Sequence, residues 1–178
     1  MNRTNKILFS ALLAGGSLAA QAQQLAFPDA QGWGRFATGA RQGGAVYHVT
    51  NLNDSGTGSL RDAISQPNRF VVFDVAGVIN IKDRLVFNNN LYIAGQTAPG
   101  EGITVYGNGV SFSGADNIIV RHMRFRMGHK GSSGKDAAGI ANGQNMIFDH
   151  CSFSWGLDET FSINPDKKGK HPDYITIS

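Results

Sequence analysis

Apolar residues in this chain occur in short runs that end at glycine, asparagine or aspartate, and almost none follow helical spacing. Residues 45–50, 70–73 and 78–81 are runs of this kind, and each predicts a strand. The abundance of Gly, at 23 of 178 residues, with only five Pro, is typical of many short strands joined by tight turns. The pattern therefore predicts an all-β chain.

One short helical segment interrupts the strands. A turn cluster at residues 53–59 ends at Ser59, and Asp62 follows three residues later, which predicts an N-cap and a helix through Gln66. Pro67 ends this helix because proline lacks the backbone N–H that a further turn needs. We expect the helix to lie as a cap across the open end of the structure that the strands begin.

The strands also repeat with a nearly constant period. An Asx residue precedes an apolar strand at Asn90, Asn117, Asn145 and Asp173, at spacings of 27, 28 and 28 residues. A repeat this short, without crossover helices, predicts a right-handed parallel β-helix whose turns stack about 4.8 Å apart. Asx residues at equivalent turns would then form a hydrogen-bonded ladder. A β-sandwich with coincidental spacing is the alternative, because its strands also recur between turns.

Superposing two repeats predicts which side chains stack. Residues two apart share a strand face, so one face would carry Ile119, Met123, Phe125 and Met127, stacked on Ile147, Cys151, Phe153 and Trp155. His122, stacked on His150, would point the other way with Arg124 and Arg126.

Asp149 falls beneath Arg121 of the previous repeat. A buried carboxylate without a partner is costly, so we predict an Arg121–Asp149 ion pair in preference to a catalytic role for Asp149.

Residues 1–22 contain two basic residues, an apolar run and a small-residue end, which predicts a secretory signal cut before Gln23. Residues 23–178 would be the exported domain, secreted or periplasmic. No other stretch approaches the roughly 20 apolar residues of a membrane span. Loss of Arg3 and Lys6 lowers the formal net charge from +3 to +1, so the charge does not indicate a nucleic-acid partner. Cys151 is the only cysteine, which excludes an internal disulfide.

The candidate chemistry begins with acids. Asp136 precedes Asp158 by 22 residues, less than one coil, so loops of adjacent turns would bring both carboxylates to one flank with Glu159. Such a group of oxygens suits a hard cation such as Ca²⁺. The alternative is that these are turn-forming or solvated acids.

Two basic features accompany the acids. Arg124 and Arg126, with His129 and Lys130, would form a cluster facing either a polyanion or only solvent. His122 and His150 lack a third ligand of matching spacing, and because Zn²⁺ sites need three, we interpret both histidines as stacking residues.

Several segments together resemble the pectate lyase family of polysaccharide lyases, which are right-handed β-helix enzymes. The matching segments are residues 54–64, 95–100, 135–137, 147–150, 152–154 and 158–163, which span most of the chain after the predicted signal. The resemblance implies cleavage of polygalacturonate by β-elimination with Ca²⁺. Polygalacturonate hydrolases, which need a cluster of aspartates, and non-catalytic β-helix adhesins or carbohydrate-binding proteins are the competing interpretations.

The resemblance also assigns roles to residues. Asp136 matches a calcium ligand, and Asp158 matches the first acid of an Asp-Gly-x-x-Asp-Ile motif in which Glu159 replaces the glycine. Ser162 stands where the second acid is expected, so Glu159 is the alternative source of that carboxylate. Arg124, Arg126 and Lys135 would bind substrate.

The family's catalytic base is an arginine on turns that would follow Ser178. The resemblance therefore implies that this chain is the N-terminal portion of a longer enzyme, which would be monomeric. The portion by itself would not cleave pectate.

Overall fold

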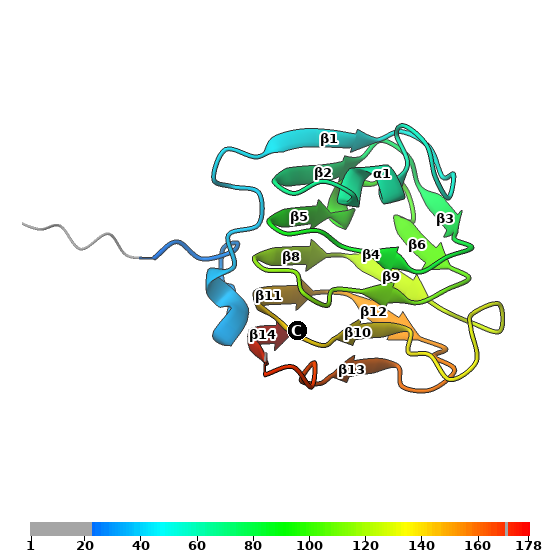
Figure 1. Ribbon diagram of the computed structural model, residues 1–178. Helices are drawn as coiled ribbons and strands as arrows, with labels where there is room; N and C mark the ends of the chain where they lie inside the picture. The colour runs from blue at the N-terminus through cyan, green and yellow to red at the C-terminus, as the bar shows by residue number, and fades with distance from the viewer. Residues whose placement is uncertain (1–22, 170) are drawn as a thin grey trace, which may run out of the picture.

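The computed structural model describes residues 23–169 and 171–178, so the predicted signal peptide at 1–22 lies outside the described residues. The chain coils into a stack of parallel strands, from β1 at the top of Figure 1 to β14 at the bottom. Four turns each contribute one strand to each of three sheets around a common core, and β1 and β14 each add a strand to one of these sheets only. The predicted all-β parallel β-helix is confirmed.

The three sheets are sheet A, sheet B and sheet C. Sheet A contains β1 (Ala45–Val49), β2 (Arg69–Phe73), β5 (Leu91–Ala94), β8 (Ile118–Arg121), β11 (Gly143–Asp149) and β14 (Pro172–Ile177). Sheet B contains β3 (Gly77–Asn80), β6 (Ile103–Tyr106), β9 (Met123–Arg126) and β12 (Ser152–Ser154). Sheet C contains β4 (Leu85–Val86), β7 (Val110–Ser111), β10 (Ala138–Ile140) and β13 (Phe161–Ile163).

The predicted helix is α1 (Leu60–Ile64), and it packs against β1 and β2 at the first turn of the solenoid (Figure 1). The Ser59 hydroxyl accepts a hydrogen bond from the Asp62 backbone N–H at 3.2 Å, as the N-cap prediction requires. Leu60 and Ile64 are buried in the core. The helix ends two residues before the predicted Gln66, and the role of a cap on the first turn is confirmed.

A second apolar cluster covers the outer side of sheet A. The N-terminal segment, with the 3₁₀ turn η1 (Trp33–Phe36), packs there against Ile119 and Ile147. Gly34 lies so close to β11 that a Cβ atom would be 2.0 Å from the Met146 carbonyl oxygen, so only glycine fits this contact. A further 3₁₀ turn, η2 (Gly95–Thr97), follows β5.

The predicted faces are therefore wrong for Ile119 and Ile147, whereas Met123, Phe125 and Met127 are buried as expected. His122 and His150, at the corners between sheets A and B, adopt left-handed backbone conformations with φ of 54° and 52°. Each left-handed corner resets the alternation of side chains, because the chain changes direction there. Ile118 and Val120 take the inner positions instead.

Trp155 also departs from its predicted face. Its φ of 62° turns the chain at the end of β12, and the residue is 61% exposed. Met127 is buried, so the expectation that Trp155 stacks on Met127 on the same face is wrong.

The Asx positions form part of a ladder. Asn90, Asn117 and Asn145 all adopt left-handed conformations, and the Asn117 side-chain N–H donates to Asn90 Oδ1 at 3.2 Å. The fourth member differs from the prediction: Met146 pairs with Ile175, so Tyr174 takes the equivalent position and Asp173 pairs with Gln144. The last repeat is thus one residue longer than the spacing of the Asx residues indicates.

Within residues 23–169 and 171–178, no helix has the length and apolar character that crossing a bilayer requires.

Candidate functional site

Three carboxylates meet beside sheet C. Asp136 precedes β10, while Asp158 and Glu159 lie in the loop between β12 and β13. Because β10 pairs in parallel with β13, the segments that lead into these strands lie side by side. One carboxylate oxygen of each acid lies within 4.8 Å of the others. The structure therefore brings together the three acids selected from the sequence, here called the carboxylate cluster.

Backbone contacts hold the loops of the carboxylate cluster. The Ala137 N–H donates to the Glu159 carbonyl at 3.1 Å, and the Leu157 N–H donates to the Lys135 carbonyl at 3.1 Å. Gly156 permits the close turn between them, since a Cβ atom there would lie 2.2 Å from the Glu159 carbonyl oxygen.

Asp136 is the most buried acid of the three and has the most partners. The Ser162 hydroxyl donates to Asp136 Oδ2, and the Glu159 backbone N–H donates to Oδ1 at 3.4 Å. Burial by itself raises the pKa of Asp136, but the hydrogen bonds from Ser162 and Glu159 and the charge of Arg84 together hold that pKa below its ordinary value. Asp136 is therefore ionised at neutral pH.

Glu159 responds in the opposite direction. Its hydrogen bond with the Asp136 carboxyl, followed by the negative charge of Asp158, raises the pKa of Glu159 above its ordinary value. Three acids at this distance repel one another, and a bound cation would relieve that repulsion.

The basic residues predicted to bind substrate lie in two places. Arg124 and Arg126 project from the outer side of β9, where Arg124 Nε donates to the Thr104 hydroxyl at 3.0 Å and Arg126 Nη1 donates to the Ser152 carbonyl at 2.9 Å. Burial and then the charge of Arg124 lower the pKa of Arg126. Lys135 is exposed immediately before Asp136.

An aromatic pair of an exposed Trp155 and a half-buried Tyr106 was not predicted from the sequence. The rings of Trp155 and Tyr106 lie edge to face with centroids 6.4 Å apart, and Lys130 Nζ lies 5.2 Å from the centroid of the Tyr106 ring. The signal in the sequence is Trp155 itself, but strict strand alternation predicts that it shares a face with Phe153.

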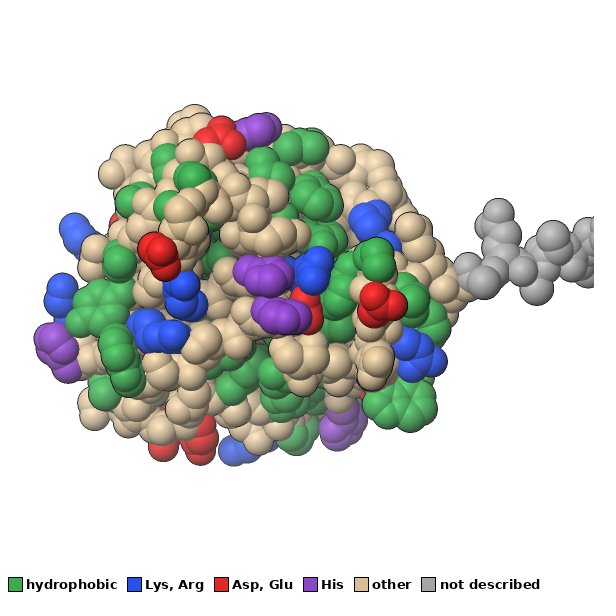
Figure 2. Space-filling view, turned by 180° about the vertical axis from the view of Figure 1, so that it is seen from behind, with side chains coloured by type: hydrophobic (Ala, Val, Ile, Leu, Met, Phe, Trp, Pro, Cys, Tyr) green, Lys and Arg blue, Asp and Glu red, His purple; other side chains and the backbone are tan. Residues whose placement is uncertain are grey.

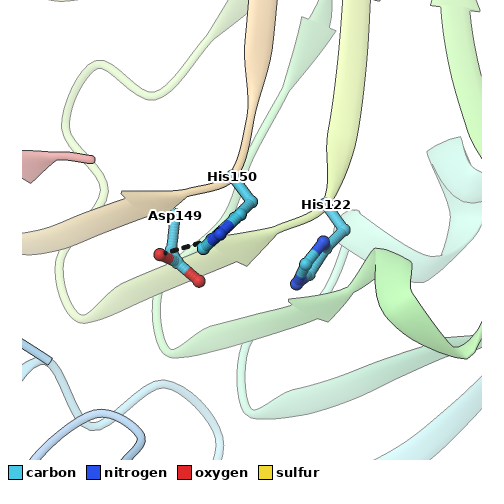
Figure 3. Close-up of side chains that lie close together, drawn as sticks. All are labelled: His122, Asp149 and His150. Atoms are coloured by element: carbon cyan, nitrogen blue, oxygen red, sulfur yellow. Dashed lines mark hydrogen bonds and ion pairs between the residues drawn. The ribbon is translucent and has the colours of Figure 1, made fainter. Parts of the chain in front are cut away.

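A second group of ligand-type side chains lies at the corners between sheets A and B. Figure 3 shows His122 and His150 with their rings parallel and Asp149 beside His150. Their ring centroids are 4.9 Å apart at an angle of 17°. Two histidines in contact are also visible near the middle of the face in Figure 2, with a basic and an acidic side chain next to them. His122, Asp149 and His150 are here called the histidine cluster.

Asp149 joins the histidine cluster to the scaffold. Its Oδ2 accepts from Arg121 Nε at 2.7 Å, so the predicted Arg121–Asp149 pair is present. Its Oδ1 lies 2.9 Å from Nδ1 of His150. Burial opposes ionisation of Asp149, but the hydrogen bonds from Arg121 and His150 lower its pKa below the ordinary value.

The expectation that the two histidines have no third ligand-type neighbour is wrong. Asp149 offers an oxygen within 4.8 Å of a nitrogen of each histidine. The sequence contains this signal, since Asp149 precedes His150 directly and His122 lies one repeat earlier, but strand alternation does not indicate that the three side chains meet at a corner.

Several fungal proteins are similar to this chain. A probable pectate lyase C of Aspergillus oryzae is 68% identical over 142 residues, which cover 80% of this chain and 34% of that protein. A probable pectate lyase C of Aspergillus fumigatus is 65% identical over 154 residues, 84% of this chain and 36% of the relative. A probable pectate lyase 5 of Arabidopsis thaliana is 31% identical over 143 residues. The chain spans about a third of the length of these relatives.

Comparison with solved structures supports the same fold. The crystal structure of Jun a 1, the major allergen from cedar pollen, superposes with a TM-score of 0.65 at 20% sequence identity, over 83% of this chain and 47% of the allergen. No protein-family model matches the chain.

Proposed function

Because this chain belongs to the pectate lyase family, we propose that it forms part of a calcium-dependent enzyme that cleaves polygalacturonate by β-elimination. The carboxylate cluster is the single observation that carries this proposal. It gathers three acids at one edge of the solenoid, in a chain whose fungal relatives are named probable pectate lyases. For this chain, polygalacturonate as the polymer, Ca²⁺ as the cation and β-elimination as the reaction are all part of the proposal.

The residues of the carboxylate cluster fit Ca²⁺. Calcium takes six to eight oxygen ligands and prefers carboxylates, and Asp136, Asp158 and Glu159 supply one oxygen or more each within a small volume. The position of Ser162 brings a hydroxyl to Asp136 where the family motif has an acid. Glu159 is therefore proposed as the source of the third carboxylate.

The proposed β-elimination removes the proton next to a uronate carboxylate, so that negative charge develops on that group. A carbon–carbon double bond then forms as the glycosidic carbon–oxygen bond breaks, and the freed oxygen leaves with a proton. A bound Ca²⁺ would stabilise this charge as a Lewis acid. Asp136, Asp158 and Glu159 would hold the cation, and Arg124, Arg126 and Lys135 would pair with carboxylates along the polymer. Guanidinium groups suit this task because they bind carboxylates through two parallel hydrogen bonds.

No described residue is assigned the removal of the proton. The arginine that the family resemblance implies, on turns after Ser178, stays a prediction. The residues of this chain are thus proposed to bind the polymer and to stabilise the negative charge that develops on the uronate. The test below measures binding. Export by the signal peptide at 1–22 is proposed with it, because the polymer is too large to enter a cell intact.

The test is calcium-dependent binding of polygalacturonate by the full chain, measured by isothermal titration calorimetry or affinity electrophoresis. We expect binding with Ca²⁺ and its loss with a chelator. Asp158→Asn, which keeps the size of the side chain and removes its charge, should weaken binding of both the ion and the polymer at least about tenfold, or about 1.4 kcal/mol.

Asp29→Asn is the matched control, because Asp29 is exposed, lies in the N-terminal segment and has a positive φ that asparagine adopts readily. This control should bind as the unsubstituted chain does. Equal loss in both variants, or polymer binding that persists without Ca²⁺, would contradict the proposal.

A further inference from the structure

We propose that the histidine cluster is a second metal site, in which His122 and His150 bind a borderline transition-metal ion such as Zn²⁺. The carboxylate cluster offers only oxygen ligands, whereas this one offers two imidazoles from adjacent turns of the solenoid. The inference is independent of the proposed function, since it concerns other residues and another class of ion.

The repeat of the solenoid positions the two imidazoles. β8 and β11 pair in register, with Arg121 opposite Asp149, so the residues that follow them occupy equivalent corners. His122 and His150 have nearly the same φ, 54° and 52°, and their rings stack at 4.9 Å. A left-handed conformation is uncommon for residues other than glycine, although histidine, with asparagine and aspartate, adopts it more often than most.

Asp149 determines which nitrogen of His150 is available. The carboxylate can only accept, so Nδ1 of His150 carries the proton in their 2.9 Å contact, and Nε2 keeps its lone pair. Metal-ligating histidines commonly donate their other nitrogen to a carboxylate in this way, which fixes the ring and increases its basicity as a ligand. The side chain of His150 is 68% exposed, so Nε2 is open to solution.

The local charge favours imidazole ligands and disfavours a hard cation. Arg121 neutralises Asp149 through their 2.7 Å contact, so the histidine cluster carries little net charge. A calcium ion requires several anionic oxygens, whereas Zn²⁺, Cu²⁺ and Ni²⁺ bind neutral imidazole nitrogens well.

The distances require only a small movement of side chains. Two ligands of one Zn²⁺ ion lie at most about 4 Å apart, since each Zn–N bond is about 2.0–2.1 Å long. One ligand-type atom of each of His122, Asp149 and His150 lies within 4.8 Å of the other two, and both histidines are exposed at a hollow that Arg124 and Ser152 also line. With His150 held by Asp149, rotation of the exposed His122 ring would bring one of its nitrogens and Nε2 of His150 to a common ion. Two histidines are fewer than the three protein ligands of a catalytic zinc centre, so water would complete the coordination and the ion would exchange readily.

The test is titration of the purified full chain with ZnCl₂, followed by calorimetry and by NMR of the histidine side chains. We expect one Zn²⁺ per histidine cluster, with the imidazole resonances of His122 and His150 shifting together. His122→Gln and His150→Gln should each weaken this binding at least tenfold.

The matched control is His48→Gln. His48 is also exposed and also lies 2.9 Å from an aspartate, Asp74, but it is not stacked on a second histidine. His48→Gln should leave Zn²⁺ binding unchanged.

The inference is overturned if the folded full chain binds no Zn²⁺, or if its imidazole signals at His122 and His150 do not move. It is also overturned if His48→Gln lowers affinity as much as the two cluster variants do. Because the NMR measurement uses the unsubstituted chain, a variant that fails to fold does not decide the outcome.

Discussion

The carboxylate cluster and the histidine cluster are built by the same solenoid but in different ways. Loops of unequal length carry Asp136, Asp158 and Glu159, which are partly or fully exposed and held mainly by backbone contacts between the loops. The histidine cluster repeats one corner of the coil and is fixed by a buried ion pair. A β-helix can therefore place variable groups of acids in its loops and repeated imidazole side chains at its corners.

The Arg121–Asp149 ion pair of the histidine cluster predicts the largest effect on stability. Asp149→Ala would leave Arg121 without its partner, and breaking a buried ion pair costs about 3–5 kcal/mol. Because a fifth of the Arg121 side chain is exposed, 21% against 7% for Asp149, we expect a loss of about 2–3 kcal/mol in the free energy of unfolding. Urea denaturation followed by circular dichroism measures this change.

The matched comparison is Asp74→Ala, which removes the exposed His48–Asp74 pair, whose side chains are 57% and 50% exposed. An exposed pair contributes about 0–1 kcal/mol, so this variant should unfold nearly as the unsubstituted chain does. Equal losses for the two variants would show that the Arg121–Asp149 pair stabilises the fold no more than the exposed His48–Asp74 pair does.

A further acid in the loops of the carboxylate cluster is expected to raise the affinity for Ca²⁺, an effect of intermediate size. Ser162→Asp places a fourth carboxylate next to Asp136, beside Gly139, whose missing side chain leaves space. We expect about tenfold tighter Ca²⁺ binding, roughly 1.4 kcal/mol, and a lower melting temperature without Ca²⁺ because the acids repel one another. Calcium calorimetry and thermal melts with and without the ion measure both effects.

Ser55→Asp adds the same charge to an exposed turn elsewhere and should change neither quantity. Unchanged or weaker Ca²⁺ binding by Ser162→Asp would mean that the Ser162 position does not face the ion.

The smallest effect is expected for the histidines. His122→Asn, which keeps a residue that adopts the left-handed conformation readily, should alter the free energy of unfolding by less than about 0.5 kcal/mol, since substitutions at exposed positions without backbone strain rarely exceed that value. The same urea experiment applies. A loss above about 1 kcal/mol would indicate that ring stacking stabilises the solenoid and that the corner is structural.

The fold could be predicted because Asx residues recur at nearly constant spacing, one in each turn of the solenoid. Asn90, Asn117 and Asn145 share one corner, and the equivalence of Arg121 and Asp149 predicted their ion pair correctly, since both belong to paired positions in sheet A. Inward and outward faces were not predictable across a corner. The left-handed residues His122 and Trp155 reset the alternation, and their conformation is not visible in the sequence.

The candidate site was predictable in part. The separation of Asp136 and Asp158 by less than one coil indicated their proximity, which the pairing of β10 with β13 explains. The hydrogen bond from Ser162 and the position of Glu159 depend on how the loop after β12 turns at Gly156. That Asp149 lies beside both histidines depends on where three side chains point at one corner. The spacing of residues along the chain does not specify those directions.

The most direct test of the central claim, that the carboxylate cluster is a calcium site, is a backbone NMR titration of the full chain with Ca²⁺. The prediction is that the amide signals of Asp136, Asp158 and Glu159 shift together and saturate, while those of His122, Asp149 and His150 stay in place. Calcium-induced shifts centred on the histidine cluster, or no saturable shift at the three acids, would contradict it.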